Sequence, residues 1–181
     1  YYAEALQHLM AAVADYFNVD TVSYWVKEQG DNNFSLYSHY AIKEQRYMAV
    51  DKVDVNSVLA LKHASELIAR HSGLGSENPK HVCQSVFKNS KDNTICSVLE
   101  SGVYVAGDIV AVIALAKQDN AYCWHPYEES FIAEISNQLS QLIINVKLKE
   151  SERKANEKLI YASNLQKVVS DLSIDSRIVD A

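Results

Sequence analysis

The chain has 181 residues, of which 48% are hydrophobic and 22% are charged. These values are typical of one folded domain with an appendage, and they exclude a disordered or fibrous protein. Its formal charge is −6, and its scattered cations form no basic patch, so we expect no nucleic-acid partner. The longest apolar run is Ile109 to Ala116, far short of the roughly 20 residues that cross a bilayer, so we expect no membrane contact.

The cysteines favour a reducing compartment. Cys83, Cys96 and Cys123 form no CxxC pair, and an odd number of scattered cysteines is a poor disulfide framework. We therefore expect a cytoplasmic protein. The chain begins at Tyr1 without a methionine and shows no signal peptide, so we expect it to be a piece of a longer protein.

The first part of the chain predicts a helix followed by a hairpin. Residues 1–17 carry a helical stripe of apolar side chains, namely Leu6, Leu9, Met10, Val13 and Phe17. Residues 21–27 and 34–42 are rich in β-branched and aromatic residues, and a turn cluster at 30–33 separates them. This pattern predicts two antiparallel strands.

The middle of the chain predicts a second helix and then more strands. Residues 54–70 have the apolar spacing of a helix, and residues 72–80 contain Gly and Pro and are typical of a loop. Residues 82–87 suit a strand or a helix. Residues 94–105 and 109–117 read as strands joined by a turn at Gly107.

The end of the chain predicts one long helix. Pro126 is the last of the five Gly and two Pro residues, and two acidic residues follow it at the start of the helix. The first part has a broad apolar stripe that suits docking on a sheet, formed by Phe131, Ile132, Ile135, Leu139, Leu142, Ile143 and Val146. A helix that reaches Leu172 is roughly 70 Å long. Because a core of this size cannot cover that length, we expect part of the helix to protrude or to pair with a partner.

The later part of this helix has a heptad pattern. Its a and d positions include the residues that we expect in a dimer seam: Leu148, Ala155, Ala162, Leu165, Val169 and Leu172. Ser151 and Lys158 occupy the other d positions, which weakens the start of the seam. We therefore expect a domain over residues 1–147 and a coiled-coil helix over residues 148–181.

The element order predicts an α+β domain in which N- and C-terminal helices flank a central antiparallel sheet. Residues 97–146 also resemble a known family of domains. Residues 97–113 resemble the paired terminal strands of GAF domains. Downstream, Trp124, Glu128 and Phe131 resemble the W-x3-E-x2-F opening of the last helix in GAF domains of bacterial signalling proteins. The chain departs from that pattern at Gly102, where many members have Pro, and at Ala111, where many have Gly.

The resemblance implies a sensory module of a larger protein, such as a sensor histidine kinase or a GGDEF-type regulator in two-component or cyclic-di-GMP signalling. It implies a homodimer formed through the terminal helices and an output domain in the same chain. In GAF-like folds the sheet face away from the terminal helices encloses a small-molecule cavity. Strand alternation assigns Val22, Tyr24 and Val26 to the helix side, so we expect four residues near the cavity: Trp25, Tyr37, His63 and Cys96. A closed core filled by these residues is the alternative.

Two other functions stay open. One GAF subgroup reduces free methionine sulfoxide with cysteines, so a cysteine-dependent redox enzyme is an alternative. A ligand-free dimerisation module is another. No cysteine precedes a histidine, the pair that covalent tetrapyrrole attachment typically uses. No GxSxG, phosphate-loop or GGDEF-like motif occurs either. His63, His71, His81 and Cys83 match no zinc spacing. We expect no catalytic or metal site, and the sequence names no cofactor or ligand.

Overall fold

The computed structural model describes residues 2–30, 34–42, 46–48, 82–88, 95–118 and 121–179. The helix predicted over 54–70 and the loop predicted over 72–80 lie outside these residues. The chain divides into two compact units, Tyr1–Leu142 and Ile143–Ala181. Each unit is described by itself.

The first unit contains one antiparallel sheet. Over the described residues the sheet has six strands in the order β3-β2-β1-β6-β5-β4, and all neighbouring pairs are antiparallel. Its strands are β1 Thr21–Lys27, β2 Phe34–Ala41, β3 Arg46–Met48, β4 Val82–Lys88, β5 Ile95–Val105 and β6 Asp108–Gln118. The predicted strands are confirmed, and the ambiguous segment at 82–87 is a strand.

The β5–β6 hairpin follows from its turn. Ala106 and Gly107 both have positive φ, at 53° and 86°. Positive φ at both central residues is the type I′ geometry, whose twist matches that of the two flanking strands. Gly107 adopts this conformation without strain, whereas Ala106 is held there by the long strand pairing on either side.

A β-bulge interrupts the pairing of β1 with β2. Tyr24 pairs with Ser38, but Trp25 pairs with Leu36, so Tyr37 has no partner on β1. A bulge of this kind turns the extra residue out of the regular alternation. Simple counting along β2 therefore assigns the wrong face to side chains on one side of the bulge.

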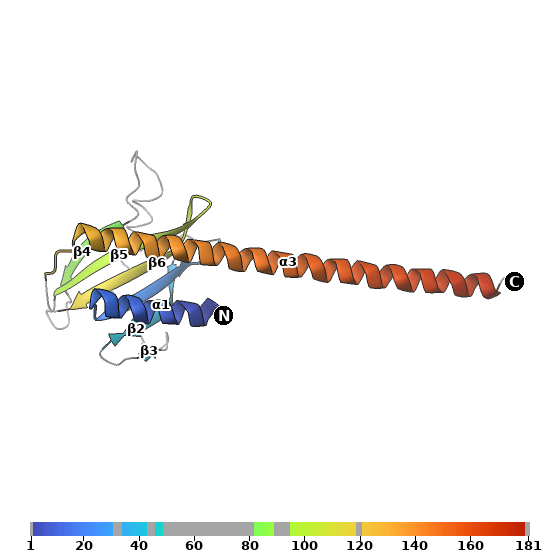
Figure 1. Cartoon of the computed structure of the whole chain (residues 1–181), viewed down its shortest axis with the longest axis horizontal. Coiled ribbons are helices and arrows are strands. Elements are labelled where there is room, and N and C mark those ends of the chain that lie inside the picture. The colour runs from blue at the N-terminus through green and yellow to red at the C-terminus, as the bar shows by residue number, and fades with distance from the viewer. Residues whose placement is uncertain are drawn as a thin grey trace. The chain divides into compact units, whose positions relative to one another are not determined.

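Helix α1, Tyr2–Phe17, and the first part of helix α3, Pro126–Val179, cover one face of the sheet (Figure 1). We call this the helix-bearing face. The hydroxyls of Tyr24 on β1 and Tyr2 on α1 share a 2.9 Å hydrogen bond. The buried residues of the helices on this side are apolar for the most part: Leu6, Met10, Val13, Phe17, Ile132, Ile135 and Leu139. The α1 stripe predicted from sequence is thus confirmed as core at Leu6, Met10, Val13 and Phe17, whereas Leu9 is only partly buried.

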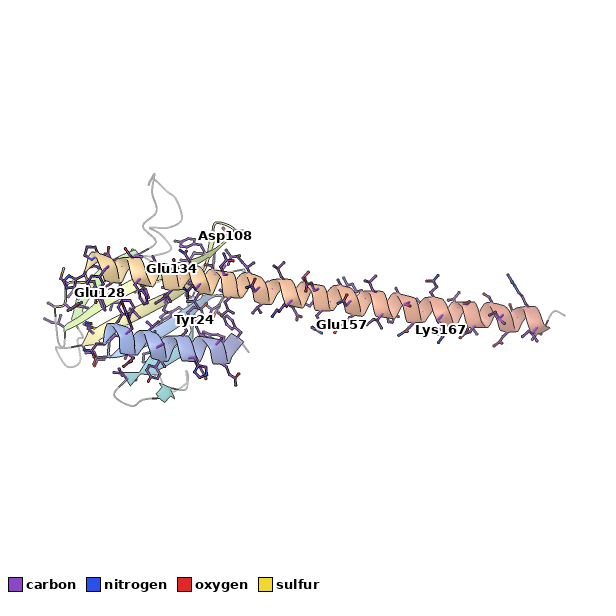
Figure 2. All side chains as sticks on the ribbon, viewed as in Figure 1. Tyr24, Asp108, Glu128, Glu134, Glu157 and Lys167 are labelled. Atoms are coloured by element: carbon purple, nitrogen blue, oxygen red, sulfur yellow. The ribbon has the colours of Figure 1, made fainter. Side chains whose placement is uncertain are left out.

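The W-x3-E-x2-F motif has a structural explanation at the start of α3. Trp124 is buried, with 3% of its surface exposed. The Glu128 carboxylate accepts the backbone N–H of His125 at 2.8 Å, which satisfies a donor at the helix N-terminus. Phe131 stacks on Tyr16 of α1 with ring centres 4.3 Å apart. The three residues therefore position and cap the helix, and Figure 2 shows Glu128 in its first turn.

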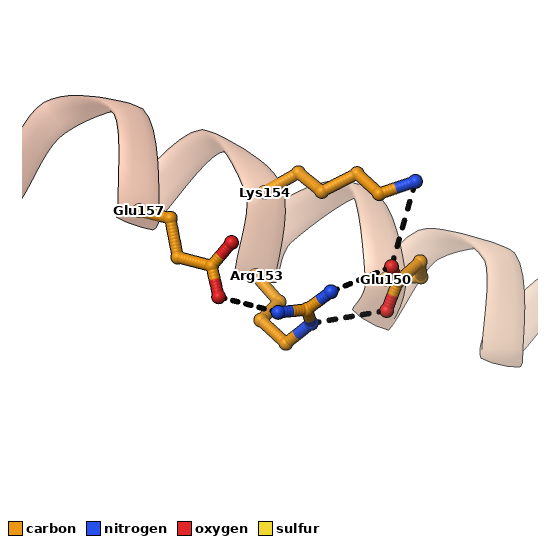
Figure 3. A network of polar contacts seen from close by, with 4 residues as sticks. All are labelled: Glu150, Arg153, Lys154 and Glu157. Atoms are coloured by element: carbon orange, nitrogen blue, oxygen red, sulfur yellow. Dashed lines mark hydrogen bonds and ion pairs between the residues drawn. The ribbon is translucent and has the colours of Figure 1, made fainter.

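The second unit is the continuation of α3. The helix is unbroken to Val179, as predicted. Its exposed surface carries a network in which Arg153 donates hydrogen bonds to both carboxylate oxygens of Glu150 at 2.8 and 3.1 Å and also to Glu157 (Figure 3). These hydrogen bonds from Arg153 lower the pKa of Glu150 to about 2. Because the network is exposed, it supports the helix only modestly.

Candidate functional site

The candidate site is the sheet face opposite the helices. Directly paired residues of antiparallel strands point to the same side, so the register defines this surface. Ser23 pairs with His39 and Ala114, Glu100 pairs with Ala114 and Cys83, and Trp25 pairs with Val112. We call the surface formed by these residues, together with Cys96, Val98 and Tyr104, the opposite face.

The opposite face is buried yet contains many polar groups. Trp25 and Glu100 each expose 1% of their surface, Ser23 and His39 are nearly as buried, and Cys83 and Cys96 each expose 9%. The helix-bearing face, in contrast, is built chiefly from apolar side chains. A buried surface with several convergent polar groups is the composition that small-molecule sites usually have.

One buried hydrogen bond joins the two strands at the β1–β2 side of this face. Ser23 Oγ lies 2.8 Å from Nδ1 of His39. This contact fixes the orientation of the imidazole ring, because the other ring nitrogen must then point away from β1. Histidine is thus held in a single orientation within a buried surface.

Trp25 provides an unsatisfied donor beside this pair. Its indole N–H is buried and has no hydrogen-bond partner among the residues that the structure describes. Leaving a buried donor unsatisfied costs roughly 1–3 kcal/mol. An acceptor on a bound molecule would remove that cost.

Cys83 and Tyr104 lie close together at the β4–β5 side of the face. Burial raises the pKa of the Tyr104 hydroxyl to about 12, and the nearby Cys83 contributes further. The Tyr104 ring also covers Gly102, where an added Cβ would lie 2.7 Å from Tyr104 Cε2. Tyr104 therefore stays neutral at physiological pH, and its ring lies over Gly102.

The sheet register keeps the two buried thiols apart. Cys83 is level with Glu100, whereas Cys96 lies four residues earlier on β5. At about 3.3 Å per residue this is a separation of roughly 13 Å, beyond the roughly 7 Å that a disulfide tolerates between Cα atoms. Cys123 is exposed. Within the described residues, no group of three His, Cys, Asp or Glu side chains is placed to hold a metal ion.

The structure places two of the four residues predicted near a cavity, Trp25 and Cys96, on the opposite face but does not bring them together. Trp25 pairs with Val112 and Cys96 with Gln118, so the two lie six residues, or roughly 20 Å, apart along the strands. The prediction for Tyr37 is wrong about the face, because the bulge turns it to the helix side, where its ring meets Tyr2 at 6.3 Å and Tyr24 at 6.1 Å. His63 lies outside the described residues.

Sequence reasoning missed three residues of this face: His39, Glu100 and Tyr104. Glu100 was within reach, because counting every second residue from Cys96 along β5 leads to it. Tyr104 was within reach in the same way, because the count along β5 continues to it and the shift in the β5–β6 pairing adds its extra residue, Val110, to β6. His39 is two residues after Tyr37, so the count that placed Tyr37 near the cavity leads to His39 as well. The bulge turns Tyr37, and not His39, to the other face.

Comparisons with known proteins bear on the fold. No known family model matches the sequence, and no curated protein matches it. GAF3 from Slr1393 of Synechocystis sp. PCC6803, in its photoproduct state, is similar with a TM-score of 0.59 and 11% identity over 82% of this chain and 96% of that one.

Two further solved structures have the same arrangement. A GAF domain from a phosphoenolpyruvate-protein phosphotransferase of Coxiella burnetii has a TM-score of 0.53 at 9% identity, over 83% of this chain and 86% of that one. A domain of a putative two-component sensor histidine kinase from Sinorhizobium meliloti has a TM-score of 0.52 at 11% identity, over 83% and 96%. At this level of identity the likeness concerns the backbone architecture. The chain therefore has the GAF fold, an α+β domain with an antiparallel sheet and flanking helices.

Proposed function

We propose that this chain is a non-catalytic sensory module of a larger bacterial signalling protein. The module binds a small molecule on the opposite face and passes the signal through a dimeric C-terminal helix to an output domain in the same chain. The parent protein would be a sensor histidine kinase or a GGDEF-type regulator, acting in the cytoplasm.

The unsatisfied indole N–H of Trp25 carries the ligand-binding part of this proposal. Trp124 also has a buried N–H without a partner among the described residues. The two differ in surroundings, because Trp124 packs on the helix side, where Lys117 lies 5.4 Å from its ring and Tyr122 lies 5.1 Å from it. Trp25 instead lies on the polar buried surface beside the Ser23–His39 pair.

The chemistry of the opposite face favours a ligand that carries a hydrogen-bond acceptor. The buried indole N–H of Trp25 would donate to that acceptor, and the Ser23–His39 pair lies beside Trp25 on the same face.

The second unit supports the dimer. Its apolar residues are largely exposed, for example Leu165 at 52% and Leu172 at 64%. An isolated helix with such a surface is marginal in water and gains stability by burying its stripe against another helix. In the described part of the chain, no helix has a stretch long and apolar enough to cross a membrane. Because the exposed apolar residues of the second unit have heptad spacing, a second copy of the chain is the partner that we propose.

Native mass spectrometry of the freshly purified full chain tests the ligand. We expect a retained small molecule in the wild-type protein. Losing one buried hydrogen bond weakens binding by about tenfold, so Trp25→Phe should retain much less of it. Trp124→Phe is the matched control, since it removes an equally buried indole from the helix-bearing face, and it should retain the wild-type amount.

Two negative results together would refute ligand binding. If wild-type protein retains no small molecule, and small molecules extracted from the expression host do not raise its melting temperature, the module binds no ligand. The chain would then be a ligand-free dimerisation module. Equal retention by both tryptophan variants would place the ligand elsewhere.

A further inference from the structure

Helix α3 begins against three neighbouring strands of the sheet. The backbone N–H of Tyr122, in the segment that leads into the helix, donates to Ser97 Oγ on β5 at 2.8 Å. The Lys117 ammonium on β6 lies 3.7 Å from the centre of the Tyr122 ring. Gln84 on β4 reaches the helix itself. Side chains from β4, β5 and β6 therefore hold the place where α3 starts.

Gln84 makes two hydrogen bonds at this junction. Its Nε2 donates to the backbone oxygen of Trp124 at 3.2 Å and to the carboxylate of Glu129 at 2.5 Å. Trp124 precedes the helix and Glu129 lies in its first turn, so one side chain spans the helix start, which lies at the β4 side of the sheet (Figure 1). The two hydrogen bonds fix where the first turn lies relative to β4.

The residue before Gln84 lies on the other side of the same strand. Successive residues of a strand point to opposite faces, and the register agrees, because Gln84 pairs with Leu99 whereas Cys83 pairs with Glu100. Cys83 is buried on the opposite face, close to Tyr104. β4 thus presents one residue to the opposite face and the next residue to the start of α3.

The strand beside β4 has the same arrangement but is held more firmly. On β5, Cys96 lies on the opposite face and Ser97 accepts the Tyr122 N–H. In the described sheet β5 pairs with β4 and with β6, whereas β4 is the last strand and pairs with β5 alone. Displacing β5 strains hydrogen bonds on both of its sides, and displacing β4 strains them on one. We therefore expect an equal push on the two thiols to reach α3 chiefly through β4.

We propose that Gln84 positions the start of α3 according to what occupies the β4 side of the opposite face. This inference rests on the proposed function, in which a ligand binds on that face. A ligand that reaches Cys83 displaces β4, and the two hydrogen bonds of Gln84 carry the displacement to the first turn of α3. The ligand then favours one arrangement of the helix start over another, which is the differential interaction that a signal needs.

Hydrogen exchange of backbone amides, followed by NMR in the full chain, tests this coupling without a known ligand. Cys83→Met adds bulk on the opposite face in place of a ligand. Cys96→Met is the matched control, because the two thiols each expose 9% of their surface and lie on the same face. The reporters are the N–H groups of Glu128 and Glu129, which donate to the His125 carbonyl at 3.0 and 3.2 Å in the first turn.

The expected rates follow from the loss of about one hydrogen bond at the helix start. Cys83→Met should speed exchange at both reporters about fivefold, and Cys96→Met should change it by less than about twofold. Gln84→Met keeps the length of the side chain but removes its hydrogen bonds, so adding Cys83→Met to it should cause no further change. Amides of residues 132–140 are the internal reference, because a general loss of stability speeds exchange there as well.

Three results would overturn the proposal: an unchanged rate in Cys83→Met, equal effects of Cys83→Met and Cys96→Met, or an effect of Cys83→Met that persists in Gln84→Met. If a methionine variant does not fold, Cys83→Ala and Cys96→Ala create space in place of bulk and are compared by the same criteria. Failure of the proposed function is distinguishable, because wild-type protein then retains no small molecule, whereas this coupling is measured without one.

Discussion

Replacing the Glu128 carboxylate with an amide should destabilise the first unit far more than the same change at the neighbouring Glu129. Glu128 is buried, with 4% of its surface exposed. It accepts the backbone N–H of His125 at 2.8 Å and the Tyr122 hydroxyl at 3.2 Å. Glu129 is partly exposed, and its carboxylate accepts a 2.5 Å hydrogen bond from the Gln84 side chain.

The size of the effect of Glu128→Gln follows from these contacts. The amide oxygen still accepts the His125 N–H, so the cap is retained. Converting a charged hydrogen bond to Tyr122 into a neutral one removes about 1 kcal/mol. Losing a negative charge at a partly buried helix N-terminus removes about another 1 kcal/mol. The free energy of unfolding should therefore fall by about 2 kcal/mol, or about 4–8 °C in melting temperature for a chain of this size.

Urea unfolding followed by circular dichroism measures this difference. Wild type, Glu128→Gln and Glu129→Gln are compared at one protein concentration, because dimerisation makes the apparent stability depend on concentration. Glu129→Gln should reduce stability by less than about 1 kcal/mol. If the two variants unfold at the same urea concentration, Glu128 does not cap the helix in the way that its contacts indicate.

Three other predictions concern the tyrosines and the thiols. Tyr2→Phe leaves the buried Tyr24 hydroxyl unsatisfied and should lower the free energy of unfolding by about 1–3 kcal/mol. Tyr24→Phe should lower it less, because only the half-buried Tyr2 hydroxyl is then left without its partner. Thermal melts of both variants measure the difference, and a larger loss in Tyr24→Phe would contradict the prediction. A coloured disulfide reagent at neutral pH should titrate Cys123 within minutes and the two sheet cysteines only after urea is added; a second fast thiol would instead favour the redox enzyme. Burial raises the pKa of Tyr104 to about 12, so the unfolded chain loses that proton first and stability falls as pH rises from about 10 to 12. Tyr104→Phe should lose less stability between pH 9 and 11 than wild type in urea titrations, and an equal loss would show that Tyr104 is not buried.

The sequence by itself determined the two helices and the four strands β1, β2, β5 and β6 of the described chain. Helical spacing marks Leu6 to Phe17, alternation marks the long strands, and the absence of Gly and Pro after Pro126 marks the final helix. These signals are local, because each reflects the period with which one element presents side chains to a core. The three-residue β3 is too short for such a period to be visible. The sequence of β4 suited a strand or a helix, and its pairing with β5 decided that it is a strand.

Only the tertiary structure decided which side chains meet. Trp25 and Cys96 could be assigned to the opposite face from alternation alone, because β1 and β5 are regular there. Tyr37 could not, because a one-residue bulge in β2 reverses the face, and nothing in the local pattern indicates where the pairing slips. The face of Glu100 follows from alternation along β5, but its burial, with 1% of its surface exposed, does not, since a glutamate in a strand is ordinarily exposed. Burial of a side chain is a property of the whole fold and of no single segment.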